Sequence, residues 1–89
     1  MAKLEVYGKL VHQFEIEQKP TIKVCVIIVD EIGGRNKGRS LCRFEIVNRH
    51  IDQVVPKLKV GSNYTFDCEY FSKAVGNNYY NFIEVYDVK

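Results

Sequence analysis

The chain has 89 residues and a formal net charge of +2, and 46% of its residues are hydrophobic. This length predicts one domain, residues 1–89, and the apolar content excludes an intrinsically disordered chain. No apolar run of about 18 residues occurs and the start lacks an apolar stretch, so we expect no membrane span, no signal peptide and a cytoplasmic location.

The first half of the chain has the alternation of apolar and polar residues that is typical of strands. Over residues 3–17 the even positions are mostly apolar and the odd positions mostly polar, which predicts one long strand with a single buried face. Gly8 interrupts the apolar face and indicates a bulge or a bend at a barrel corner. Residues 21–32, which are apolar on both faces, and residues 40–49 are the next two predicted strands.

The second half begins with a short helix. Residues 51–58 have helical spacing, and Pro56 limits the helix to one or two turns that end near Lys57. Two further strands, residues 63–75 and 79–88, are joined by a hairpin at residues 76–78. Five strands with a short helix between the third and the fourth predict an all-β OB-fold barrel.

The second half also resembles the single-stranded-DNA-binding protein family, in its small phage and bacterial OB-fold form. The residues that carry the resemblance are the helical segment 51–58, the turn Lys59-Val60-Gly61-Ser62 and the final Ile83-Glu84-Val85. The resemblance implies single-stranded DNA binding in replication or recombination, in a bacterial or phage-infected cell. The chain departs from the family because it has no Trp and stops at Lys89, so we expect no acidic tail for partner recruitment.

Binding of a single strand requires cations that follow the phosphates and flat rings that stack on the bases. Outward positions where rings and cations occur together are therefore the candidate binding residues. Three clusters result: Tyr7, Lys9 and Lys23; then Arg35, Lys37, Arg39 and Arg43; then Phe71, Lys73, Tyr79 and Tyr80. We expect the second and third clusters to flank one groove of the barrel.

Other interpretations of these residues stay open. An ordinary solvated loop explains Arg35, Lys37 and Arg39 about as well as a binding loop does. Alternation places one member of each of the pairs Tyr70/Phe71 and Tyr79/Tyr80 outside, where it could instead pack in a dimer interface. We expect Tyr64 and Phe66 in the core, a partly buried His12, and a capping or surface role for His50.

The sequence argues against an enzyme, a cofactor and a metal site. It has no phosphate-binding loop motif and no recognisable arrangement of nucleophile, base and acid. Its three cysteines are odd in number and far apart, and each lies in an apolar alternation, which predicts small buried hydrophobes.

The leading hypothesis is sequence-tolerant binding of single-stranded DNA by electrostatic contacts and base stacking. Because one small barrel covers few nucleotides, we expect a homodimer or homotetramer. The alternatives are an OB-fold adaptor that binds protein within a replication assembly, and an RNA-binding module that uses the same stacking chemistry.

Overall fold

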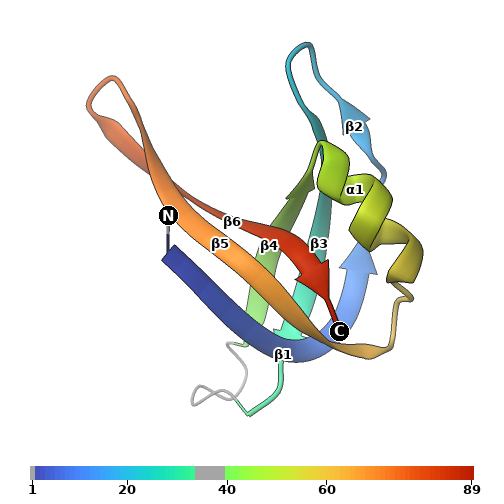
Figure 1. Ribbon diagram of the computed structural model, residues 1–89. Helices are drawn as coiled ribbons and strands as arrows, with labels where there is room; N and C mark the ends of the chain where they lie inside the picture. Colours follow the sequence, from blue (N-terminus) through green and yellow to red (C-terminus); the bar gives the residue numbers. More distant parts are fainter. Residues whose placement is uncertain (1, 34–39) are drawn as a thin grey trace.

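The computed structural model describes residues 2–33 and 40–89 (Figure 1). In chain order its strands are β1 (Ala2–Gln13), β2 (Glu17–Gln18), β3 (Lys23–Glu31), β4 (Leu41–Val47), β5 (Asn63–Val75) and β6 (Asn78–Val88). Between β4 and β5 lie helix α1 (Arg49–Val54) and a 3-10 turn (Val55–Lys57). None of the helical segments in these described ranges is long and apolar enough to cross a membrane.

The strands close into an OB-like barrel, as the sequence predicts. Their order is β1-β5-β6-β4-β3, and β3 pairs again with β1 to complete a closed five-stranded arrangement. The barrel pairs are antiparallel except β4 and β6, which run parallel and meet at Glu45 and Glu84. The two-residue β2 adds to the edge of β3, so α1 still follows the third barrel strand, as expected.

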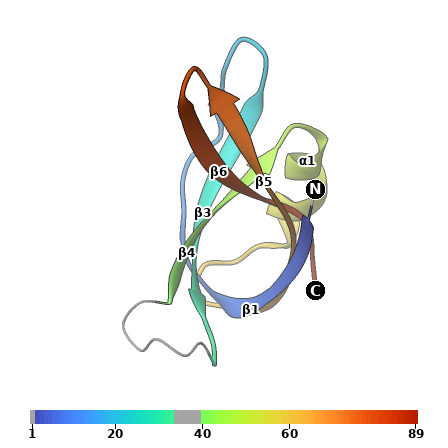
Figure 2. The same cartoon turned by 90° about the vertical axis from the view of Figure 1, so that its left-hand side faces the viewer.

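Strand β1 curves beneath the barrel and belongs to both halves of the sheet (Figure 2). Gly8 is the first residue to pair on both edges, with Tyr64 of β5 and with Glu31 of β3. A Cβ atom at Gly8 would lie 2.6 Å from Val29 Cγ1 and 2.7 Å from the carbonyl oxygen of Asp30. The close approach of the strands therefore requires glycine, which confirms the predicted barrel corner.

The prediction of one alternating strand through residue 17 is wrong beyond Leu10. The register with β3 shifts between Leu10 and His12, so the faces of the strand exchange at Val11. His12 and Phe14 are consequently exposed, whereas sequence alternation places both on the buried face. The regular strand ends at Gln13.

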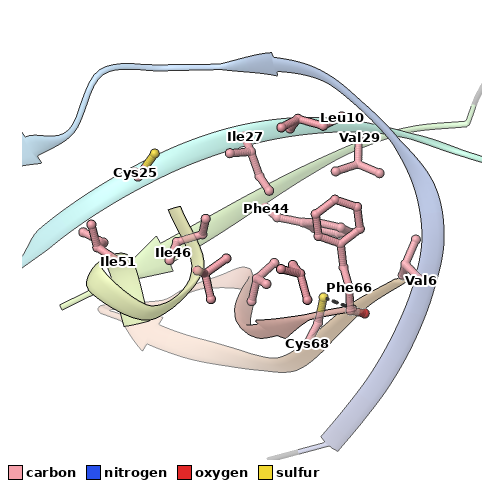
Figure 3. Close-up of a cluster of buried hydrophobic side chains, with 13 residues drawn as sticks. Val6, Leu10, Cys25, Ile27, Val29, Phe44, Ile46, Ile51, Phe66 and Cys68 are labelled. Carbon is pink, nitrogen blue, oxygen red and sulfur yellow. Dashed lines mark hydrogen bonds between the residues drawn. The ribbon is translucent and has the colours of Figure 1, made fainter. Parts of the chain in front are cut away.

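The core fills the barrel with side chains from every barrel strand and from α1 (Figure 3). Phe44 and Phe66 are fully buried and their rings meet edge to face, with centroids 5.9 Å apart. The prediction of a core Phe66 is confirmed. Tyr64 is half-buried and packs against the core, and its hydroxyl donates to the carbonyl oxygen of Lys57 at 3.1 Å.

The cysteines contribute to the apolar interior, as expected. Cys25 and Cys68 are buried and Cys42 is half-buried. Burial raises the pKa of Cys68 to about 12.

Candidate nucleic-acid interface

An open groove of about 290 Å³ lies on the outer face of β3. Its floor is apolar, its rim carries charges, and its lining comes from β3, from β4 and from the segment that follows β1: Phe14, Glu15, Glu17, Val24, Val26, Ile28 and Arg43. The bulge at Val11 creates this groove, because it turns Phe14 outward. The backbone N–H of Phe14 then donates to the carbonyl oxygen of Val26 at 2.9 Å, and the Phe14 ring is 48% exposed.

Arg43 supplies a cation on the β4 side of the groove. It lies opposite Ile28 in the ladder between β3 and β4, and its side chain is 60% exposed, as the alternation predicts. The guanidinium Nη2 lies 3.5 Å from Oε2 of Glu45. The Glu45 side chain is only 16% exposed, but the Arg43 end of the pair is open to solvent, so Arg43 can exchange the pair for a phosphate.

The hairpin of β5 and β6 carries a second platform on the outer face. Phe71 and Phe82 lie opposite each other in the ladder, and their rings stack with centroids 5.6 Å apart and planes at 21°. The ammonium of Lys73 lies 5.6 Å from the Phe71 centroid and 5.4 Å from the Phe82 centroid. Tyr80 is paired with Lys73 two positions further along the ladder, on the same face, and is 50% exposed.

The hairpin extends past the barrel, so aromatic rings are exposed on both of its sides. Tyr79 pairs with Ala74 on the side away from Phe71, and it is 78% exposed. Both members of the Tyr79/Tyr80 pair are therefore outside, although alternation within a barrel predicts only one. In the other pair Tyr70 is exposed and Phe71 is half-buried.

The remaining candidates do not form one cluster. Tyr7 accepts a backbone hydrogen bond from Ile32 at 2.9 Å, and Lys9 pairs with Asp30, which places both at the end of the barrel where β3 stops. Lys23 is at the opposite end of β3, where its backbone N–H donates to Oδ1 of Asn48 at 3.1 Å. The structure therefore separates Lys23 from its predicted cluster.

The expected flanking of one groove by the cation-rich loop and the hairpin is not observed for the described residues. The end of β3 and the beginning of β4, on either side of that loop, lie at the end of the barrel away from the hairpin in both views (Figures 1 and 2). The hairpin instead shares its end of the molecule with the segment between β1 and β3. Arg35, Lys37 and Arg39 lie outside the described residues.

Carboxylates occupy the middle of the outer face, between the hairpin platform and Arg43. Glu69 pairs with Glu84 across β5 and β6, and Glu84 pairs with Glu45 across β6 and β4. Burial, together with the charge of Glu45, raises the pKa of Glu84. These groups repel phosphates, so a bound strand would have to turn its bases toward this part of the surface.

Sequence reasoning missed Phe14, Val26, Ile28 and Phe82. The bulge turns Phe14 to the face opposite to the one that alternation predicts. Phe82 stacks on Phe71 only because of the register between β5 and β6. The continuous apolar run in residues 24–29, which shows that β3 is apolar on both faces, was the available signal for Val26 and Ile28.

No group of three His, Cys, Asp or Glu side chains within residues 2–33 and 40–89 is placed to hold a metal ion. Comparison of the chain with protein-family models and with curated proteins gives no match. Function therefore has to be inferred from the OB-like barrel and from the chemistry of its outer face.

Proposed function

We propose that this barrel binds single-stranded DNA across its outer face and tolerates many sequences. The observation that carries the proposal is the stacked pair of Phe71 and Phe82 with the Lys73 ammonium 5.4–5.6 Å from both ring centroids. Rings and a cation that lie together on the outer face are the two elements that single-strand binding requires. Arg43 and the Phe14 groove extend this surface toward β3.

The mechanism is passive. Bases stack on the hairpin rings, and each stacked base contributes roughly 1–3 kcal/mol whatever its identity. Lys73 and Arg43 approach phosphates and release their counterions, which makes the affinity fall as salt rises. A strand held in this way cannot pair with its complement.

Oligomerisation would lengthen the bound stretch. One OB fold covers about 4–16 nucleotides, so we propose that the chain acts as a homodimer or homotetramer. Sedimentation of the free protein and of its complex with an oligonucleotide measures this directly.

A second candidate is an adaptor that binds a peptide. The feature that favours it is the rim of the apolar groove, where Glu15 and Glu17 would suit a peptide that carries cations. An adaptor would leave oligonucleotides unbound even at low salt.

The test is fluorescence anisotropy with a labelled mixed-sequence DNA strand of about 20 nucleotides, longer than one OB-fold site. Duplex DNA and an RNA of the same sequence serve as competitors. We expect the single strand to bind best and its affinity to fall steeply with salt. Preference for the RNA would change the ligand class, and no binding at low salt would refute the proposal.

A pair of variants locates the interface on the hairpin. Phe71→Ala removes one ring of the stacked platform and should weaken binding at least about fivefold. Tyr79→Ala removes a ring that is more exposed than Phe71, from the other side of the same hairpin, and should have a smaller effect. Equal losses in the two variants would contradict the placement of the strand on the outer face.

A further inference from the structure

The groove on β3 has a shape and a charge distribution that differ from those of the hairpin platform. Phe14 and Arg43 lie on opposite sides of β3, because the segment that follows β1 bonds to one edge of that strand and β4 pairs with the other. The apolar floor between them consists of Val24, Val26 and Ile28. The groove thus has an aromatic wall, an apolar base and a cation on its far side.

The volume of the groove limits what can enter it. At about 290 Å³ it lies at the lower limit of small-ligand pockets, which start near 300 Å³. It has room for one flat ring beside Phe14, and too little room for several side chains of a peptide. A single base turned out of the strand fits this description.

The charged groups on the rim decide how that base is oriented. Glu15 and Glu17 line the groove together with Arg43, so a phosphate is favoured only on the Arg43 side. Glu17 lies 3.9 Å from the Lys19 ammonium, and both side chains are largely exposed, so this weak pair leaves the carboxylate accessible. The edge of the base must therefore face the carboxylates.

We propose that the groove takes one base of the bound strand and that Glu15 and Glu17 favour a base with an exocyclic amino group over uracil or thymine. This inference rests on the proposed function, and it adds a base preference at one position of an otherwise tolerant site. An ionised carboxylate only accepts hydrogen bonds. The amino group of cytosine or adenine donates to it, whereas uracil and thymine place the carbonyl oxygen O4 there.

The experiment compares two oligonucleotides that differ mainly at this edge, oligodeoxycytidine and oligodeoxyuridine of equal length, by anisotropy at pH 8. We expect the wild-type protein to bind oligodeoxycytidine at least about fivefold more tightly, the lower end of the discrimination from a side-chain contact to a base edge. The variant Glu15→Gln/Glu17→Gln should bring the ratio of the two affinities toward one, because a glutamine amide both accepts and donates.

The matched control is Glu5→Gln/Asp52→Asn, which removes the same charge from exposed positions outside the groove. It should strengthen binding of both oligonucleotides by a similar factor and keep their ratio. Equal wild-type affinities, or a ratio that falls equally in both double variants, would overturn the inferred base preference.

Two further outcomes separate this inference from the proposed function. If the mixed-sequence strand does not bind either, the proposed function itself fails. If that strand binds but Phe14→Ala leaves its affinity unchanged, DNA binding stands and the groove belongs to another occupant, such as a peptide, which overturns the assignment of a base to it.

Discussion

Replacement of Gly8 by alanine tests how the barrel closes. At Gly8 the strand β1 is paired on both edges, and an added Cβ would lie 2.6 Å from Val29 Cγ1 and 2.7 Å from the Asp30 carbonyl oxygen. Non-bonded carbon atoms are ordinarily about 3.5–4.0 Å apart, so the contact with Val29 Cγ1 is too short by about 1 Å. The contact with the Asp30 oxygen is also shorter than a Cβ atom tolerates. Val29 is fully buried and the oxygen belongs to the backbone, so neither can move alone.

The expected cost follows from these contacts. Overpacking a core costs typically about 1–3 kcal/mol, and the upper half of that range applies when the backbone has to shift. Alanine lowers the conformational entropy of the unfolded chain, which stabilises the protein by about 0.4–1 kcal/mol. The net decrease in the free energy of unfolding is therefore about 2 kcal/mol. For a domain of this size, that loss lowers Tm by about 8–16 °C.

Thermal and urea unfolding followed by circular dichroism measure this effect. Gly76→Ala is the comparison, because its Cβ would meet nothing within 4 Å and only its φ of +61° opposes a side chain. We expect a smaller loss for Gly76→Ala than for Gly8→Ala. A Gly8→Ala protein that melts within about 2 °C of the wild type, or above Gly76→Ala, would refute the close approach of β1 and β3 at this corner.

Three further predictions concern charge and the buried thiol. Arg43→Glu should weaken single-stranded DNA binding roughly tenfold and leave the domain folded, since the side chain is 60% exposed. Because the variant loses the pair with Glu45 and places a second carboxylate beside it, a small fall in Tm is expected. Anisotropy measures the affinity and a melting curve checks the fold, and unchanged affinity would remove Arg43 from the site. The pKa of Glu84 is raised, so its ionisation costs stability that is recovered as the pH falls through the folded-state pKa. Glu84→Gln should therefore raise Tm at pH 7 and lose this advantage near pH 4. A difference in Tm between variant and wild type that does not change with pH would contradict a raised pKa of Glu84. With a pKa of about 12, roughly one Cys68 thiol in 10⁴ is ionised at pH 8, so a thiol reagent should label Cys68 only after the protein unfolds. Mass spectrometry measures the labelling, and rapid labelling of the native protein would show that the barrel opens.

Local chemistry explains why the elements could be predicted. The alternating residues 40–49 and 63–75 form β4 (Leu41–Val47) and β5 (Asn63–Val75). Such strands can be predicted because successive side chains of a half-buried strand point to the core and to solvent in turn. Pro56 lies within the 3-10 turn that ends at Lys57, where the sequence predicts the end of the helix.

The proposed binding surface was less accessible to sequence reasoning. Arg43 was identified because simple alternation continues through β4. Phe14 was assigned to the buried face because nothing near Val11 reveals the bulge, which appears only when β1 pairs with β3. One extra residue in a strand moves the side chains that follow it from the core face to the solvent face, and the reverse.

The sequence by itself therefore determined the barrel class, the order of its strands, the short helix and the glycine at the corner, since each depends on periodicity or on a residue's own conformational limits. Only the tertiary structure decided that Phe71 stacks on Phe82, that Phe14 walls a groove on β3, and that Tyr7 and Lys9 lie far from Lys23. These juxtapositions arise from cross-strand register and barrel closure, which bring together residues distant in the chain, and no local pattern encodes such distances.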